Sequence, residues 1–459
     1  MHLILLSGGS GKRLWPLSSG SRSKQFLELL RSDDGRSESM FQRVCRQLAS
    51  VKGVKWDSVT VIAGEIQRDQ LSAQSESEID ILIEPSGRDT FPAISYASAW
   101  LHSVKNIGKE EIVAIMPVDP FVDESFFEKI FAIESEILST DANIILIGCK
   151  PDKPTEKFGY ILVDPDENRE CAVSSKPVKG FQEKPSESEA AELISKGALW
   201  NCGVFGMRLG FVLELLAGRY GVSQYDMGHM NEVFHTLSKI SFDFEVVETA
   251  ANVRVLEYSG DWKDLGTWES FAEEMSESAI GNVIANRCKN SHIINELDIP
   301  VVAVGMEDSV IVASHAGILV AKKDETDSLK RIVEPIMDRP VYEKRRWGEY
   351  LVLYRYSNEH MDTLIKKLIL EQGRQISYQT HSHRKETWTI IRGEGVLYFE
   401  DEKVEISAGE TVSIDIGKKH GLYAVTGLEL IEVQFGYPLV EEDIIRLEYD
   451  WDPDIEYRI

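Results

Sequence analysis

Through the first third of the chain, short apolar runs alternate with segments of helical periodicity. Such runs, bounded by turn signals, predict buried strands. Ser39 and Gln42 have the spacing of a helix capping box, with apolar residues at helical spacing from Phe41. Pro92 predicts the start of another helix. Strands alternating with helices predict an α/β domain with a mixed, mainly parallel sheet and helices on both faces. The expected strands cover 3–6, 58–63, 79–83, 112–116 and 143–148.

The pattern changes near Met275, where short β-rich runs replace the alternation. Runs within 281–333 lead into a basic, polar join that contains Pro335 and Pro340. Over 348–447 the chain consists of apolar runs separated by glycine-rich turns, which predicts an all-β barrel or sandwich. No long internal repeat is evident in the sequence. We therefore expect three parts, an α/β domain over 1–275, a short β-rich segment over 276–335 and an all-β domain over 341–459.

The chain is strongly acidic, with a net charge of -26 and a pI near 4.9. Nucleic acids and anionic membranes attract clustered Lys and Arg, so this charge argues against both partners. The five cysteines show no CxxC spacing, which argues against a zinc ribbon and is typical of a reducing compartment. No stretch approaches the roughly 18 apolar residues of a membrane span, and the first apolar run is too short for a signal peptide. We expect a cytoplasmic protein that binds neither nucleic acid nor membranes.

The segment SGGSGKRLWPLS over 7–18, the glycine loop, directly follows the first apolar run. A Walker A loop would need glycine at Leu6, and a dinucleotide fingerprint would need glycine at Leu14, so both are excluded. Closely spaced glycines still let backbone N–H groups approach phosphate oxygens, and nearby Arg and Lys can bind them. A tight turn with ordinary surface cations is the alternative. The candidate phosphate contacts are Gly8, Gly9, Ser10, Gly11, Lys12, Arg13, Arg22 and Lys24.

Several segments together resemble the signatures of sugar nucleotidyltransferases, and most closely those of mannose-1-phosphate guanylyltransferases. They follow one another in the family's order and cover residues 1 to about 270. The resemblance implies a Rossmann-like nucleotidyltransferase domain. After the glycine loop, the matching segments are KQFLEL from Lys24, EPSGRDTFPAI from Glu84, PVDPFV from Pro117, FQEKP from Phe181, WNCGVF from Trp200 and GDWKDLGTW from Gly260.

The resemblance implies that GTP and mannose 1-phosphate are converted to GDP-mannose and pyrophosphate. Asp119 and Asp264 are expected to hold Mg²⁺, a hard cation that prefers carboxylate and phosphate oxygens. Arg13 and Lys24 are expected to face the outer phosphates of GTP, and Lys184 the sugar phosphate, as the catalytic cations. Singly, each has a plainer explanation, such as Asp119 in a turn. Further expected contacts are Pro85 and Arg88 for the nucleotide, and Gly159, Tyr160, Glu183, Asn201 and Gly203 for the sugar phosphate.

The segment YQTHSHRKETW over 378–388 points to a second site. Alternate residues of a strand share a face, so His381 and His383 are expected to point together. Glu386 has the opposite parity, and a bend or bulge would have to bring it round. His420 could add a ligand from another strand. Three imidazoles and a carboxylate inside a small barrel would suit Zn, Fe, Ni or Mn, whereas surface histidines on a polar strand are the alternative.

This segment resembles a cupin, and more narrowly the C-terminal domain of bifunctional phosphomannose isomerase/guanylyltransferases. The stretch IEVQFGYPLVEEDIIRLE from Ile431 strengthens the match. The resemblance implies a jelly-roll domain in which those four ligands hold Zn²⁺ and mannose 6-phosphate and fructose 6-phosphate are interconverted. Arg384 is our candidate for stabilising the phosphate or the enediolate, and the base stays unassigned.

The β-rich segment between the domains resembles the short β-helical piece through which guanylyltransferases pair subunits. It implies a homodimer, and a plain linker extension is the alternative. We expect a bifunctional enzyme of GDP-mannose and polysaccharide biosynthesis. Three alternatives stay open, namely a guanylyltransferase with a non-catalytic cupin, a transferase for another sugar 1-phosphate such as a heptose, and a nucleotide sensor without turnover. Asp119, Asp264 and Lys184 argue against a sensor, since a sensor needs no transition-state machinery.

Overall fold

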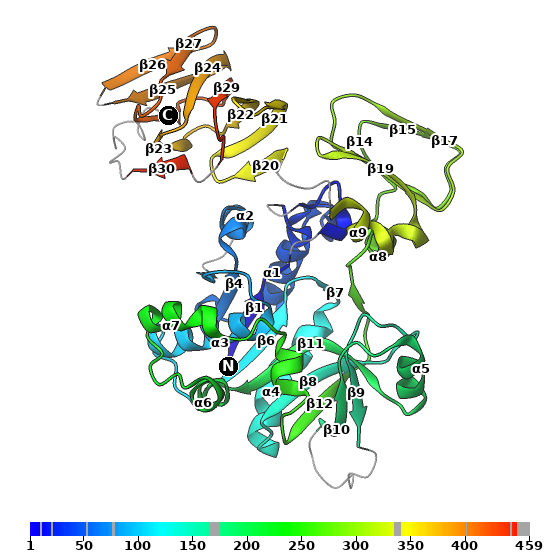
Figure 1. Cartoon of the computed structure of the whole chain (residues 1–459). Coiled ribbons are helices and arrows are strands. Elements are labelled where there is room, and N and C mark those ends of the chain that lie inside the picture. The colour runs from blue at the N-terminus through cyan, green and yellow to red at the C-terminus, as the bar shows by residue number, and fades with distance from the viewer. Residues whose placement is uncertain are drawn as a thin grey trace. The chain divides into compact units, whose positions relative to one another are not determined.

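The computed structural model describes the whole chain except residues 10–11, 20–21, 52–53, 76–78, 165–173, 335–340, 401, 441–442 and 448–459. The chain divides into two compact units, labelled by element in Figure 1. One comprises Met1–Ser278 with Ala321–Arg331, and the other comprises Ala279–Val320 with Ile332–Ile459. Over the described part of the chain, no helix is both long and apolar enough to span a membrane.

A nine-stranded sheet forms the centre of the first unit. Its strands are β1 (His2–Leu6), β4 (Val59–Ala63), β5 (Asp80–Ile83), β6 (Ile112–Pro117), β8 (Ile144–Cys149), β9 (Tyr160–Val163), β10 (Lys176–Gln182), β11 (Leu199–Arg208) and β12 (Val253–Tyr258). They follow the order β5-β4-β1-β6-β11-β8-β12-β10-β9. The β5-β4-β1-β6 and β8-β12 neighbours are parallel, whereas β11 is antiparallel to β6 and β8. The pairings of β10 with β12 and β9, and of β11 with β9, are also antiparallel. The predicted mixed sheet is confirmed, but it is not mainly parallel, because the long strand β11 and the strands after β8 add antiparallel pairs.

Helices cover both faces of this sheet (Figure 1). Alternate residues of β1 enter different cores, because Leu3 and Leu5 pack on the side of the helices over 40–50 and 124–140, and Ile4 and Leu6 on the side of the helices over 90–103 and 209–220. The helices are α1 (Met40–Ser50), α2 (Arg68–Gln74), α3 (Thr90–Ser103), α4 (Glu124–Thr140), α5 (Glu187–Ser195), α6 (Leu209–Tyr220), α7 (Met227–Val233), α8 (Trp268–Glu274) and α9 (Leu329–Val333). The predicted capping box forms at the start of α1.

Two short antiparallel ribbons accompany the main sheet. One pairs β2 (Leu30–Arg31) with β3 (Ser37–Glu38), and the other pairs β7 (Pro120–Val122) with β13 (Trp262–Asp264). The second ribbon brings together two chain segments far apart in sequence: Asp264 lies in β13, and Asp119 directly precedes β7.

The second unit begins with a small parallel solenoid. One sheet contains β14 (Ala279–Gly281), β16 (His292–Asn295), β18 (Ser309–Ser314) and β19 (Gly317–Lys322), and the other pairs β15 (Val283–Asn286) with β17 (Val301–Val304). Val283 pairs with Val301 and His292 with Val310, an offset of 18 residues, whereas Ala279 pairs with Ile293 at an offset of 14. The offsets differ between the first turn and the next, so the solenoid has no regular repeat that the sequence pattern could reveal.

The rest of the second unit is an all-β domain of two sheets, as predicted. A six-stranded sheet contains β20 (Tyr342–Arg345), β21 (Gly348–Ser357), β22 (Asp362–Leu370), β29 (Leu428–Gly436), β24 (Arg384–Arg392) and β27 (Thr411–Ile414). A five-stranded sheet contains β26 (Glu402–Ser407), β25 (Glu394–Phe399), β28 (His420–Ala424), β23 (Gln375–His381) and β30 (Ile444–Arg446). Inward-facing residues such as Trp388, Leu422 and Leu430 form its core.

Candidate functional site

The glycine loop leaves the carboxyl edge of the sheet directly after β1, where ligands of such sheets bind. Ser7 is fully buried, and the Gln25 amide donates hydrogen bonds to its carbonyl oxygen (3.3 Å) and its hydroxyl (3.2 Å). Gly8 and Gly9 are exposed, and Gly9 has φ +117°, which L side chains rarely adopt. The loop is therefore fixed at its base while the backbone of its first glycines is accessible.

The remaining loop residues are placed only in part. Ser10 and Gly11, predicted phosphate contacts, lie outside the described residues, as does the side chain of Lys12. Arg13 lies in a short 3₁₀ turn and is exposed, so its guanidinium is available to a ligand.

Lys24 lies between two aspartates from distant parts of the chain. Its Nζ is 2.9 Å from Asp119 Oδ2 and 3.3 Å from Asp264 Oδ1, and its side chain is 16% exposed. Burial by itself lowers the pKa of Lys24, but attraction to both carboxylates outweighs burial and raises that pKa above its ordinary value. The neighbouring Ser23 hydroxyl donates to the Gly9 carbonyl (3.4 Å), which links this cation to the glycine loop.

The β7–β13 ribbon explains why these aspartates meet. Asp264 pairs with Pro120, the residue after Asp119, and the Val118 N–H bonds the Leu6 carbonyl (3.1 Å) at the end of β1. Both carboxylates are partly exposed, and one cation, the Lys24 ammonium, reaches both. Two converging carboxylates beside a phosphate-type loop suit a Mg²⁺ ion, which prefers such oxygens. The predicted pair is therefore assembled.

A half-buried glutamate, Glu84, follows β5 in the predicted nucleoside segment, and the sequence pattern gave it no role. The Glu84 N–H bonds the Ala63 carbonyl (2.9 Å), while Glu84 Oε2 is buried without a hydrogen-bond partner among the described residues. Burial raises the pKa of Glu84 to about 7. The adjacent Pro85 is exposed, and Arg88 donates to the Leu237 carbonyl (2.9 Å). An acid directly after a strand was the only sequence signal.

Glu183 and Lys184 form an ion pair beyond β10. Lys184 Nζ lies 2.7 Å from Glu183 Oε1, with Glu183 buried and Lys184 exposed. Lys184 has φ +46°, which is uncommon for a residue with a side chain. A Cβ at Gly159 would come within 2.5 Å of Glu183 Oε2, so glycine is needed there for the carboxylate to fit. These predicted residues are close together, with the ammonium facing solvent.

Asn201 joins the same group from β11. Its N–H donates to the Gly159 carbonyl (2.8 Å), its Nδ2 donates to Asp243 Oδ1 (2.7 Å), and its Oδ1 accepts from the Gly203 N–H (3.1 Å). Gly203 has φ +71°, and the pairing of β11 with β8 shifts register just after Asn201. Asp243 was not predicted, because nothing in the sequence near Asn201 indicates its partner.

Tyr160 does not take the expected place beside a sugar ring. Its side chain is fully buried in a core, and its hydroxyl donates to the Thr155 carbonyl (3.1 Å) and accepts from the Thr155 N–H (3.0 Å). Its position on β9, paired with Gln182 and Trp200, turns the ring toward the packed side of the sheet. The prediction for this side chain is corrected, and its role is packing.

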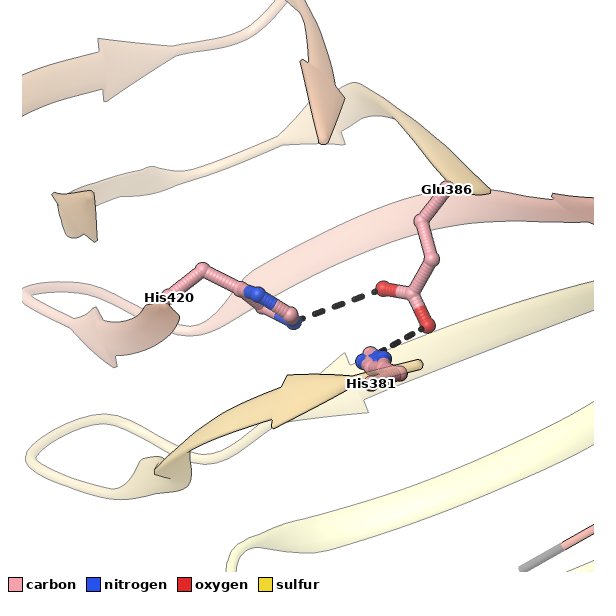
Figure 2. A group of neighbouring side chains, drawn as sticks. All are labelled: His381, Glu386 and His420. Carbon is pink, nitrogen blue, oxygen red and sulfur yellow. Dashed lines mark ion pairs between the residues drawn. The ribbon is translucent and has the colours of Figure 1, made fainter. Parts of the chain in front are cut away.

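His381, Glu386 and His420 point toward one another inside the barrel (Figure 2). One ligand atom from each lies within 4.8 Å of the others. His381 Nε2 is 3.3 Å from Glu386 Oε1, and His420 Nε2 is 3.6 Å from Glu386 Oε2. His381 ends β23 and His420 begins β28 in one sheet, whereas Glu386 lies on β24 of the other. The cluster therefore joins both sheets.

The chemistry of this cluster suits a divalent cation. All three side chains are buried, and neither Nε2 atom has a hydrogen-bond partner among the described residues. Burial, followed by the neighbouring His420, lowers the pKa of His381 to about 3, and burial also lowers the pKa of His420. Burial, then Glu432, raises the pKa of Glu386. His420 Nδ1 lies 3.0 Å from the Lys418 carbonyl oxygen. Because that oxygen can only accept, Nδ1 carries the proton, and Nε2 presents its lone pair to the cluster.

His383 and Arg384, both predicted site residues, lie apart from this cluster. His383 is 56% exposed, and its Nδ1 is 2.9 Å from Asp443 Oδ1. The buried Arg384 donates to Asp443 Oδ2 (3.3 Å) and to the Val440 carbonyl. Burial acts to raise the pKa of Asp443, but hydrogen bonds from His383 and the local backbone outweigh burial and lower that pKa to about 2. The strand alternation expected for His381 and His383 fails because β23 ends at His381.

Glu386 is held by inward-facing side chains that the sequence analysis did not assign. Trp388 Nε1 donates to Glu386 Oε2 (3.1 Å) and to Glu432 Oε1 (3.2 Å), and Gln434 Nε2 donates to Glu386 Oε1 (3.1 Å). Lys366 Nζ lies 4.0 Å from Glu432 Oε2. Glu432 and Gln434 are two apart on β29, so strand parity was the available signal.

The fold and these residues define an enzyme of the nucleotidyltransferase class with an added cupin-like β domain. The chain belongs to the nucleotidyl transferase family, whose family model matches residues 2–279. Residues 335–449 match the family described as mannose-6-phosphate isomerase C-terminal.

Curated relatives match along nearly the whole chain. The alginate biosynthesis protein AlgA of Pseudomonas aeruginosa is 30% identical and covers 97% of this chain and 96% of that protein. Mannose-1-phosphate guanylyltransferase of Escherichia coli is 29% identical, with 97% of each chain covered. A solved structure titled mannose-1-phosphate geranyltransferase, from Thermus thermophilus, is 26% identical with a TM-score of 0.61, and covers 73% of this chain and 98% of that one.

Proposed function

We propose that the first unit transfers the GMP moiety of GTP to mannose 1-phosphate, giving GDP-mannose and pyrophosphate. The observation that carries the proposal is Lys24 held between Asp119 and Asp264 beside the glycine loop, in a chain whose relatives include a mannose-1-phosphate guanylyltransferase. This arrangement places a cation, and two carboxylates suited to a metal ion, where a reaction between two polyanions needs positive charge.

In the proposed reaction, a phosphate oxygen of mannose 1-phosphate forms a bond to the α-phosphorus of GTP. The bond from that phosphorus to the bridging oxygen of the β-phosphate breaks, and pyrophosphate leaves with the electron pair. The nucleophile is already anionic, so no base is needed. Catalysis then consists of positioning and charge neutralisation by Arg13, Lys24 and Lys184. Mg²⁺ held by Asp119 and Asp264 would supply further positive charge to the phosphates.

Glu84 is our candidate for selecting guanine. Parallel pairing places the end of β5 two strands from the glycine loop, through β4. Guanine presents two adjacent donors, N1–H and the N2 amino group, which one carboxylate can accept together. The buried Glu84 Oε2 is such an acceptor without a partner among the described residues. Adenine, cytosine and uracil do not offer this pair of donors.

For the second unit, we propose interconversion of mannose 6-phosphate and fructose 6-phosphate with Zn²⁺. His381, Glu386 and His420 would hold the ion, which when bound would act as a Lewis acid toward developing negative charge. Trp388 and Gln434 would keep the Glu386 carboxylate oriented through their hydrogen bonds. His383 and Arg384 are not included, since both are tied to Asp443.

We further propose that the enzyme acts in the cytoplasm as a homodimer paired through the solenoid. Ile284 and Val302 are adjacent across β15 and β17 and are 57% and 60% exposed. Neighbouring exposed apolar side chains on a short sheet favour association with a like surface. A second copy of the chain presents the same exposed apolar residues, so the two surfaces can pair about a two-fold axis.

Pyrophosphate release tests the first activity. Purified protein is mixed with Mg²⁺, mannose 1-phosphate and GTP, ATP, CTP, UTP or dTTP in turn, and Lys184→Ala is assayed beside the wild type. Release that needs GTP and collapses in the variant is expected. Release only with another sugar 1-phosphate, such as a heptose, would reassign the substrate, and binding of GTP without release from any mixture would favour a sensor.

A further inference from the structure

The turn that begins at Asp243 has no role in the reaction as described so far. Residues 243–248 nevertheless contact both Asn201 and Glu183, two of the residues expected to bind the sugar phosphate. Asp243 Oδ1 accepts from Asn201 Nδ2 at 2.7 Å. Glu248, five residues later, accepts from the Glu183 N–H at 3.2 Å. One short segment therefore holds Asn201 by its side chain and Glu183 by its backbone.

These contacts fix the orientation of the Asn201 amide. Its Oδ1 accepts from the Gly203 N–H (3.1 Å), and that backbone group can only donate. Its Nδ2 donates to the carboxylate of Asp243 (2.7 Å). Rotating the amide by 180° would place the amino group against a donor and the oxygen against an acceptor. The remaining Nδ2–H of Asn201 thus has a defined direction.

Asp243 is itself held by the backbone on both sides. The Phe242 N–H donates to Thr90 Oγ1 (2.8 Å), at the start of α3, and the Glu248 N–H donates to the Asp243 carbonyl (3.0 Å). The backbone that carries the Asp243 carboxylate is thereby anchored to the start of α3 and to the rest of its own turn. A fixed acceptor is what an orienting group needs, since a mobile one would let the amide move with it.

We propose that Asp243 is a positioning residue for the sugar 1-phosphate, which holds the Asn201 amide so that its free N–H meets a sugar hydroxyl. This inference rests on the proposed function, because it takes Asn201 and Lys184 to be on the sugar-phosphate side of the site.

The charges around Asp243 agree with an orienting role rather than a phosphate-binding one. Burial, followed by the nearby Glu183 carboxylate, raises the pKa of Asp243 to about 7, while Lys184 and the Asn201 hydrogen bond act in the opposite direction. Both the carboxylate and the protonated carboxyl group keep an oxygen that accepts from Asn201. The orientation of the amide therefore does not depend on which form is present near neutral pH.

The test compares Asp243→Ala, Asp243→Asn and a matched control, Glu245→Gln. Glu245 lies in the same turn, but its carboxylate pairs with Arg219 (3.1 Å). Steady-state pyrophosphate release gives KM for mannose 1-phosphate and for GTP separately. We expect Asp243→Ala to raise KM for mannose 1-phosphate up to roughly tenfold, as for one hydrogen bond between neutral groups, with KM for GTP changed less than about twofold. Asp243→Asn keeps an acceptor oxygen and should restore most of the loss, and Glu245→Gln should match the wild type.

Equal rises in both KM values, or failure of Asp243→Asn to rescue, would overturn the proposal. A second readout separates this outcome from failure of the proposed function. The side-chain amide signals of Asn201 in a ¹⁵N spectrum, assigned by their loss in Asn201→Asp, need no substrate. Signals that shift and exchange faster in Asp243→Ala but not in Glu245→Gln support the positioning role even if mannose 1-phosphate is not the substrate. Unchanged signals in Asp243→Ala would contradict it.

Discussion

Replacing Lys24 by methionine removes the cation between Asp119 and Asp264 while keeping a side chain of similar length. Charges 2.9 and 3.3 Å apart attract by about 6 and about 5 kcal/mol at an effective dielectric constant of about 20. Desolvation, at several kcal/mol per ion, offsets most of this attraction. Because Lys24→Met leaves two carboxylates facing each other, we expect the free energy of unfolding to fall by about 1–3 kcal/mol.

The effect of Lys24→Met on catalysis should be larger than its effect on stability. The ammonium is proposed to neutralise charge on the departing pyrophosphate, and loss of one such group typically lowers kcat about a hundred- to a thousandfold. Urea denaturation and pyrophosphate release measure the two quantities on the same samples. Lys263→Met is the matched control, since Lys263 adjoins Asp264 in sequence but pairs with Glu274. A kcat for Lys24→Met within tenfold of the control, in folded protein, would refute the reasoning.

Three further predictions concern the other sites. Glu84→Gln should reduce the preference for GTP over ATP at least about tenfold. In the wild type, KM for GTP should rise below about pH 7, because protonated Glu84 loses an acceptor oxygen, whereas KM for GTP of the variant should show no such pH dependence. His420→Ala should abolish tight zinc binding, measured by metal analysis after dialysis, while pyrophosphate release stays unchanged; retained stoichiometric zinc would contradict the assigned ligands. Val302→Glu should convert a dimer to a monomer in sedimentation velocity, and an unchanged sedimentation coefficient would move the interface elsewhere.

Local signals predicted the elements of the first unit well. The capping box at Ser39 satisfies backbone donors within a single helical turn, so it forms independently of distant parts of the chain. The apolar run before the glycine loop became a strand buried on both faces, as in parallel sheets. The meeting of Asp119 and Asp264 followed from the family resemblance, whereas its physical cause, the ribbon that pairs Asp264 with Pro120, is a long-range contact.

Strand parity predicted the metal centre only in part. The rule assumes that a strand continues, but β23 ends at His381 and the chain then crosses to the other sheet. His383 therefore turns outward to Asp443, and Glu386 enters from β24 without a bulge at that point. Where a strand ends depends on sheet pairing between distant segments, which no local pattern contains.

Partners distant in sequence account for the remaining differences. Asn201 and Asp243 are hydrogen-bonded although they are 42 residues apart, and no sequence pattern near either residue indicates the other. Tyr160 was expected beside the sugar as part of what the family resemblance implies, but the direction of its side chain is set by the pairing of β9 with two other strands. The stacking of the solenoid strands has a related cause, since it is set by pairing between segments such as Val283 with Val301, 18 residues apart.

The central claim, transfer of GMP to a sugar phosphate, is tested most directly by following the α-phosphate of GTP. The full-length protein is incubated with Mg²⁺, mannose 1-phosphate and GTP labelled with ³²P at the α-position, and the products are separated by anion-exchange chromatography. The account predicts that the label appears in GDP-mannose in step with unlabelled pyrophosphate. Label in free GMP or GDP, or label that stays in GTP, would contradict it.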